Sequence, residues 1–190
     1  MPTDKGKQRL INLQAPAGYG KTFLLNCVDL FYREFKHEGT LACSALVGVA
    51  ASLYRDGCTT HALLDCGIGE CDREPSGDAL ERLGRLEGVV CDEISMANGN
   101  IMRAIKRNLE YAGKETFHET KLDNIFEADS LPYGGKTVIL CGDLMQLDCV
   151  KPDRNGGFAW ESPLWEDYQP IFLMHNFRQE VRCSFVVRLT

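Results

Sequence analysis

The feature that most constrains this chain is a short glycine-containing loop between an apolar stretch and an amphipathic stretch. Residues 10–14 are an apolar run that predicts a strand, and residues 15–22 read Ala-Pro-Ala-Gly-Tyr-Gly-Lys-Thr. From Lys21 to near Gly39, apolar residues recur at helical spacing. The predicted buried face of this helix carries Phe23, Leu24, Cys27, Val28 and Phe31. A strand, a tight turn and a helix in this order can wrap backbone N–H groups around a phosphate.

The loop nearly fits the phosphate-binding pattern GxxxxGK[ST]. In that pattern the lysine, here Lys21, reaches the β- and γ-phosphates of the nucleotide, and the hydroxyl of Thr22 binds Mg²⁺. Ala15 stands where the pattern has its first glycine, which is harmless only if the backbone there is extended. The less favoured alternative is an incidental Gly-Lys-Thr in an ordinary strand–turn–helix. The predicted ATP-binding residues are Ala15, Pro16, Ala17, Gly18, Tyr19, Gly20, Lys21 and Thr22.

Apolar runs alternate with helical patterns along the rest of the chain. After the first strand, further strands are expected at 40–47, 86–91, 137–141 and 171–174, and helices at 49–54 and 98–111. Residues 65–77, 113–135 and 151–163 are expected to be loops or insertions. Alternation of this kind predicts an α/β fold with a mostly parallel sheet and helices on both faces. The ligand site is then expected at the carboxyl ends of the strands.

Two carboxylates end the apolar run at residues 88–91. We expect Asp92 to hold Mg²⁺, usually through water, and Glu93 to act as the general base that polarises the attacking water. The alternative is an acidic pair that only caps the next helix. The presence of the phosphate loop favours the catalytic interpretation.

A second apolar run, at residues 137–141, ends in Gly-Asp and leads to Gln146. An amide at such a strand end can sense whether the γ-phosphate is present. The alternative for Gln146 is a surface loop residue, and Asp143 is either a supporting partner of the site or a helix cap.

Composition excludes several classes of protein. The chain has 190 residues, of which 44% are hydrophobic and 25% charged, so an extended or disordered chain is not expected. The net charge of −6 argues against nucleic-acid binding by bulk charge. No apolar run is long enough to span a membrane, and the polar N-terminus does not resemble a signal peptide. We expect no membrane partner.

The chain contains nine cysteines, an odd number, and several of them lie in apolar strand-like runs. This pattern predicts reduced, buried thiols in a reducing intracellular compartment. His61, Cys66 and Cys71 have a spacing that suggests zinc, but no CxxC pair accompanies them. We therefore do not favour a structural zinc site.

Six stretches, in order over roughly residues 10–188, resemble the Pif-type (petite integration frequency) DNA helicases of superfamily 1, which include the helicase parts of Helitron transposons. The phosphate loop is similar to the family's G-x-A-G-x-G-K-[ST]. The other five resembling stretches are residues 47–61, Asp-Glu-Ile-Ser-Met at 92–96, Pro-Tyr-Gly-Gly-Lys at 132–136, Gly-Asp-Leu-Met-Gln-Leu at 142–147 and Leu173 with Asn-Phe-Arg-Gln at 176–179.

The resemblance implies a RecA-like P-loop motor domain that binds Mg²⁺ and ATP and moves 5′ to 3′ along single-stranded DNA. It assigns catalytic roles to Lys21, Glu93 and Gln146, with Arg178 as an arginine finger that stabilises transition-state charge. The stretch at 47–61 gives weaker candidates for DNA contact: Ala50, Ala51, Thr60 and His61. The family also implies roles in DNA repair, recombination and telomere maintenance. It implies a nuclear or mitochondrial location in a eukaryote and a cytoplasmic one in a bacterium.

The resemblance also divides the chain into three parts. Residues 1–9 are a short polar N-terminus, and residues 10–175 are the first RecA-like domain. Residues 176–190 carry the arginine-finger motif and begin a connection to a second RecA-like domain that the chain lacks. We therefore expect slow hydrolysis, weak binding of DNA and no unwinding by this half alone.

Three positions depart from the family pattern, and they keep other functions open. Besides Ala15, Val47 replaces a hydroxyl residue, and Asp-Cys at 148–149 replaces Pro-Pro. One alternative is a non-motor nucleotide-binding module, either a switch domain or the remnant of a transposon helicase. The other is an RNA helicase of the same superfamily.

Overall fold

The computed structural model describes residues 8–37, 39–67, 72–120, 131–147, 149–150 and 156–177 of the 190-residue chain. Arg178 and Asp148 lie outside the described residues, as do Cys71, most of the short N-terminus and nearly all of the segment 176–190. The proposed roles of Arg178 and of the C-terminal segment therefore rest on the sequence.

A six-stranded, all-parallel sheet forms the centre of the molecule, with strand order β3-β2-β4-β5-β1-β6. The strands are β1 (Leu10–Gln14), β2 (Leu41–Ala45), β3 (Cys58–Thr59), β4 (Gly88–Asp92), β5 (Thr137–Gly142) and β6 (Gln169–Phe172). This confirms the predicted parallel α/β fold. The two-residue strand β3 was not predicted, because so short a strand has no apolar alternation to reveal it.

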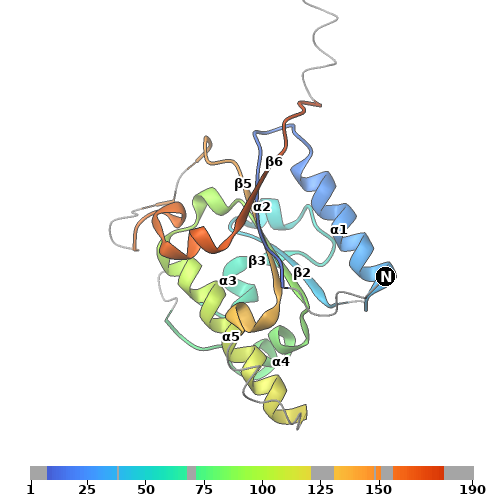
Figure 1. Cartoon of the computed structure of the whole chain (residues 1–190), viewed down its shortest axis with the longest axis vertical. Helices are drawn as coiled ribbons and strands as arrows, with labels where there is room; N and C mark the ends of the chain where they lie inside the picture. Colours follow the sequence, from blue (N-terminus) through green and yellow to red (C-terminus); the bar gives the residue numbers. More distant parts are fainter. Residues whose placement is uncertain are drawn as a thin grey trace, which may run out of the picture.

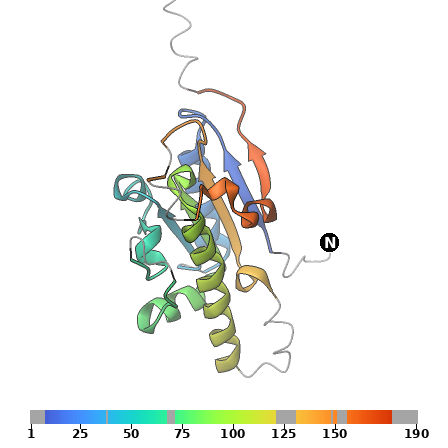
Figure 2. The same cartoon turned by 90° about the vertical axis from the view of Figure 1, so that its left-hand side faces the viewer.

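Helices cover both faces of this sheet (Figures 1 and 2). The long helices α1 and α5 lie on opposite sides of the strands in Figure 1. The α-helices are α1 (Lys21–Phe35), α2 (Gly48–Ala51), α3 (Thr60–Leu63), α4 (Gly77–Arg85) and α5 (Gly99–Thr120). The 3-10 turns are η1 (Ile94–Met96), η2 (Pro132–Gly135), η4 (Ala159–Glu161) and η5 (Pro163–Asp167).

Alternating side chains of the central strands build two separate cores. In β4, Val89 and Cys91 belong to the larger core with α5, whereas Val90 belongs to the smaller core with α1. In β5, Leu140 and Ile139 divide in the same way. Because both faces are buried, these strands are continuous apolar runs, as is typical of a parallel sheet.

The predicted buried face of α1 is wrong except at Val28. Leu25, Val28 and Tyr32 pack against the sheet, whereas Phe23 is 76% exposed and Phe31 is 53% exposed. Helix α1 carries apolar residues on two sides, so spacing alone could not show which side meets the sheet. The helix also ends at Phe35, four residues before Gly39.

Several helical segments also extend or form where the sequence did not predict a helix. Helix α5 continues to Thr120, nine residues beyond its predicted end and into the expected insertion. Helix α4 forms where no helix was expected. Within the predicted loop at 151–163, residues Ala159–Glu161 form the 3-10 turn η4.

Candidate active site

The candidate site lies at the carboxyl ends of β1, β5 and β4, which are neighbours in the sheet. Gln14 at the end of β1 pairs with Gly142 at the end of β5. The Ala15 backbone N–H then donates to the Gly142 carbonyl at 3.2 Å. The phosphate loop therefore begins directly beside the end of β5, with β4 next in line.

The loop has the backbone conformation that its glycines were expected to provide. Gly18 and Gly20 have φ values of 88° and 86°, the left-handed region that glycine adopts without a steric penalty. Ala15 is not among the residues with positive φ, so alanine is accommodated there without strain. The departure from the glycine pattern at Ala15 therefore leaves the loop geometry intact.

Lys21, the first residue of α1, folds back over this loop. Its Nζ donates to the Ala15 carbonyl at 2.6 Å and to the Pro16 carbonyl at 3.3 Å. A half-buried ammonium group is thus held above a turn of backbone at the start of a helix. Both the ammonium and the helix N-terminus favour a bound anion.

Asp92 ends β4 and is 3% exposed. Its Oδ1 accepts a hydrogen bond from the Glu93 backbone N–H at 2.8 Å. Its Oδ2 accepts one from the Tyr54 hydroxyl at 2.5 Å. Burial raises the pKa of Tyr54 well above its usual value, as does the charge of Asp92, so the hydroxyl stays protonated and acts as the donor.

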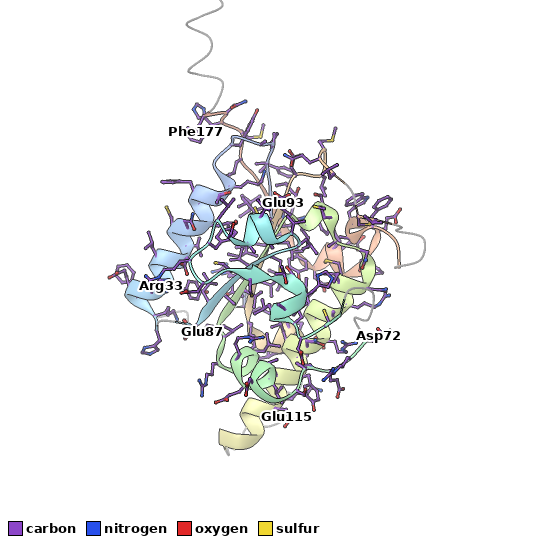
Figure 3. All side chains as sticks on the ribbon, turned by 180° about the vertical axis from the view of Figure 1, so that it is seen from behind. Arg33, Asp72, Glu87, Glu93, Glu115 and Phe177 are labelled. Carbon is purple, nitrogen blue, oxygen red and sulfur yellow. The ribbon has the colours of Figure 1, made fainter. Side chains whose placement is uncertain are left out.

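Glu93 has a left-handed backbone, with φ 57° and ψ 39°. Non-glycine residues in this region are uncommon and cluster at functional sites. Partial burial raises the pKa of the Glu93 carboxyl; the charges of Asp92 and Asp143 raise it further, and Lys21 opposes them. The carboxyl of Glu93 is therefore close enough to Lys21, Asp92 and Asp143 for their charges to act on it. In Figure 3, Glu93 and Phe177 lie toward the same end of the molecule.

Asp143 follows β5 and organises the next loop. Its Oδ2 accepts from the Gln146 side-chain amide at 2.7 Å, and its Oδ1 accepts from the Met145 N–H at 3.0 Å. Gln146 itself is exposed on the loop. Asp143 thus holds the side chain of Gln146 and stabilises a turn. No helix follows it in residues 143–147, so Asp143 is not a helix cap.

The segment after β6 returns to the phosphate loop. The Phe177 N–H donates to the Gly18 carbonyl at 3.2 Å. A Cβ on Gly20 would lie 3.4 Å from the Phe177 ring. The described part of the Asn-Phe-Arg-Gln stretch is therefore docked on the loop.

Three of the four predicted DNA-contact side chains are not at the surface. Ala50, Ala51 and Thr60 are buried, and the Thr60 hydroxyl lies 3.2 Å from the Ser44 hydroxyl in the core. His61 is half-buried, and burial lowers the pKa of its imidazole. The prediction for these three side chains is corrected, because Ala50 and Ala51 pack with Ala45 of β2 and Thr60 lies beside Ser44. The large apolar side chains that this stretch exposes are Val49 and Leu53.

The oxygen donors at the site suit Mg²⁺, which takes hydroxyl, carboxylate, phosphate and water oxygens. Thr22 and Asp92 would hold the ion together with nucleotide phosphates and water. Within the described residues, no group of three His, Cys, Asp or Glu side chains could hold a metal by itself. Cys43, Cys91 and Cys141 are buried free thiols, as predicted. In the same part of the chain, no helix is long and apolar enough to cross a membrane.

The sequence model of the PIF1-like helicases matches residues 3–185. The chain belongs to this family. It is 30% identical over 175 residues to an ATP-dependent DNA helicase Pif1 from Bdellovibrio bacteriovorus, covering 87% of this chain and 36% of the relative. It is 29% identical to the human ATP-dependent DNA helicase PIF1, covering 88% of this chain and 24% of the relative. The PIF1-like chain thus spans about a third or less of these relatives.

Solved structures show the same fold. A Pif1 helicase from Bacteroides in complex with ADP-AlF3 and single-stranded DNA superposes with a TM-score of 0.70 at 24% identity. That match covers 92% of this chain and 40% of the Bacteroides chain. The RecA-like parallel sheet of this PIF1-like chain is therefore established by its neighbours as well as by its own topology.

Sequence reasoning missed the role of Tyr54. The residue lies in the stretch 47–61, which was considered for DNA contact, 38 positions before its partner Asp92. No spacing rule connects two residues so far apart. The only available signal was an aromatic hydroxyl at the end of an otherwise apolar stretch.

Proposed function

We propose that this chain is the ATP-hydrolysing motor domain of a DNA helicase. The observation that carries the proposal is that the phosphate loop with Lys21 and the Asp92–Glu93 pair lie at the carboxyl ends of β1 and β4, on either side of the end of β5. A phosphate-binding lysine, a metal-binding acid and a candidate base are the parts that phosphoryl transfer to water requires.

The arrangement suggests how these residues act. Nucleotide phosphates would lie on the loop N–H groups, and Lys21 would exchange its carbonyl partners for phosphate oxygens. Mg²⁺ held by Thr22 and Asp92 would neutralise phosphate charge. Glu93 would take the proton of the attacking water, because a carboxylate with a raised pKa is a stronger base while it remains ionised near neutral pH.

The proposal extends to coupling and to DNA. Gln146, tethered by Asp143, would report the γ-phosphate, and Arg178 would act as an arginine finger. We propose 5′-to-3′ movement on single-stranded DNA with unwinding of duplex by the whole protein, and slow hydrolysis and weak DNA binding by this part alone. The Bacteroides relative in complex with single-stranded DNA supports the substrate class.

The wider biological roles are also proposals. The names of the relatives support action on DNA, and therefore DNA repair, recombination and telomere maintenance. Such work places the protein inside cells, in the nucleus or mitochondrion of a eukaryote or in the cytoplasm of a bacterium.

Nucleotide binding tests the core of the proposal. Affinity for a fluorescent ATP analogue with Mg²⁺ is measured for wild type, Lys21→Ala and the control Lys36→Ala. Lys36 directly follows the last residue of the same helix and pairs with Glu87 at the surface, away from the loop. Loss of contacts from a charged donor predicts about 10- to 100-fold weaker binding for Lys21→Ala only. Equal affinity in all three would overturn the proposal.

Stimulation of hydrolysis separates the motor from the alternatives. We expect oligo(dT) to raise the rate of ATP hydrolysis more than oligo(U) of the same length. Nucleotide binding without any stimulation would favour a non-motor module. Stronger stimulation by oligo(U) would favour an RNA helicase, since discrimination then rests on the 2′-hydroxyl.

A further inference from the structure

Tyr54 connects two parts of the chain that the proposed function treats separately. It follows α2, in the stretch considered for DNA contact, and its hydroxyl donates to Asp92 Oδ2 at 2.5 Å. The ring is buried in the core on the α1 side of the sheet, with Leu13, Val90 and Ile139. The hydroxyl is thus the polar end of a side chain that packing holds in place.

The contacts of Asp92 show why this hydrogen bond matters. Oδ1 is bound by the N–H of Glu93, the adjacent residue, which belongs to the same strand end. Oδ2 is bound by a hydroxyl from a distant part of the chain. The thiol of Cys141 also lies beside Asp92, but a thiol is a weak donor. The hydroxyl of Tyr54 is therefore the strong donor from outside β4 that fixes the plane of the carboxylate.

The turn that carries Tyr54 is held by backbone hydrogen bonds, since the Tyr54 N–H donates to the Ala51 carbonyl at 3.2 Å. The Gly57 N–H donates to the Tyr54 carbonyl at 3.2 Å, and a Cβ on Gly57 would lie 2.1 Å from the Ala51 carbonyl oxygen. The next loop residue but one, Asp56, pairs with Arg33 of α1 at 3.3 Å. A donor on a rigid turn can orient its acceptor, whereas a donor on a loose one cannot.

We propose that Tyr54 is a positioning residue that holds the Asp92 carboxylate in the orientation in which it takes part in binding Mg²⁺. The inference rests on the proposed function, because it takes Asp92 as the acid that serves the metal. Groups that hydrogen-bond metal ligands are commonly worth 10- to 100-fold in metal affinity. Tyr54 acts through Asp92 and needs no contact with the nucleotide.

The test measures Mg²⁺ binding without turnover. A fluorescent ADP analogue is titrated onto the protein in EDTA and at a series of Mg²⁺ concentrations. Tyr54→Phe removes one oxygen and keeps the ring, and Tyr54→Leu removes the same hydroxyl with a different apolar side chain. The control Tyr133→Phe removes another buried tyrosine hydroxyl that faces an aspartate, Asp167, at 3.5 Å in the other core.

We expect both Tyr54 variants to bind the analogue as wild type does in EDTA. The Mg²⁺ concentration that gives half of the maximal increase in analogue binding should rise by about 10-fold or more in both Tyr54 variants. It should stay unchanged in Tyr133→Phe. In an Asp92→Asn background, Tyr54→Phe should cause no further change in the Mg²⁺ dependence. This double-mutant cycle isolates the contact between the two residues.

Other outcomes overturn the inference in distinguishable ways. Unchanged Mg²⁺ dependence in a folded Tyr54 variant overturns the role of Tyr54 and leaves the proposed function standing. Absence of Mg²⁺-dependent binding in wild type overturns the proposed function and the inference together. Failure of both Tyr54 variants to fold, judged by near-UV circular dichroism while Tyr133→Phe folds, would show a structural role instead.

Discussion

Lys21 and Lys136 make the same kind of contact in two very different regions of the molecule. Each Nζ donates to two backbone carbonyls: Lys21 to Ala15 and Pro16, and Lys136 to Gly84 and Leu86. Lys21 is half-buried beside a loop at the ligand edge of the sheet. Lys136 is only 6% exposed, and burial lowers its pKa from 10.5 to about 8.

The partners of each lysine explain the difference. Gly84 and Leu86 lie at the end of α4, where the last carbonyls of a helix have no partner within the helix. Lys136 satisfies these carbonyls in the interior, so it is a structural cap. Lys21 binds the carbonyl of Ala15, which is buried, and that of Pro16, which lies on the exposed part of the loop, where a phosphate could take the place of the carbonyls. The surroundings of each side chain, and not its hydrogen-bond pattern, distinguish the proposed phosphate-binding lysine, Lys21, from the structural one, Lys136.

The largest expected effect is at the candidate site that contains Lys21. Glu93→Gln should lower single-turnover ATP hydrolysis by about 10²- to 10⁴-fold, because it removes the general base. Affinity for the ATP analogue should stay close to that of wild type, unlike in Lys21→Ala. Hydrolysis within a few-fold of wild type would exclude Glu93 as the base.

Thermal unfolding of Glu93→Gln provides a second measurement. The folded-state pKa of Glu93 is raised, so ionisation costs stability once the pH exceeds the unfolded pKa near 4.5. At pH 7 the neutral glutamine should therefore raise the Tm slightly. Below pH 4.5 both side chains are neutral and the difference should vanish. A lower Tm at pH 7 would contradict the assigned direction.

The next largest effect tests the structural role of Lys136. Lys136→Met leaves the two carbonyls at the end of α4 without their buried donor. We expect the free energy of unfolding to fall by about 1–3 kcal/mol in urea titrations. Nucleotide affinity should be unchanged. A loss of affinity without a loss of stability would place Lys136 in the site and would break the comparison.

The smallest effect is a pH dependence of stability at alkaline pH. Between about pH 8 and 10.5 the unfolded state keeps the Lys136 proton and the folded state has released it. The unfolded state then binds more protons, so the contribution of Lys136 to stability rises with pH in this window. The free energy of unfolding of wild type relative to Lys136→Met should increase by up to about 1 kcal/mol per pH unit. A flat or falling difference would contradict the lowered pKa.

The local order of elements around the phosphate loop followed from the sequence. Residues 10–14, the glycines of the loop and the start of a helix at Lys21 agree with the structure, because strand, turn and helix signals are short-range. The buried face of α1 did not follow, since both of its sides carry apolar residues and only the sheet selects one. The inward packing of Ala50 and Ala51 did not follow either, because it depends on their contact with Ala45 of β2.

By itself, the sequence determined the α/β class and the parallel sheet, and it singled out Lys21, Asp92 and Glu93 as candidate site residues, because periodicity and motifs reside in neighbouring residues. Only the tertiary structure decided that β5 lies between β1 and β4, which brings Asp143 next to the acid pair. It also decided that Tyr54 reaches Asp92. Such contacts join residues that are far apart in the chain. Which of these residues meet is determined by the packing of strands and turns, and no local sequence pattern encodes that packing.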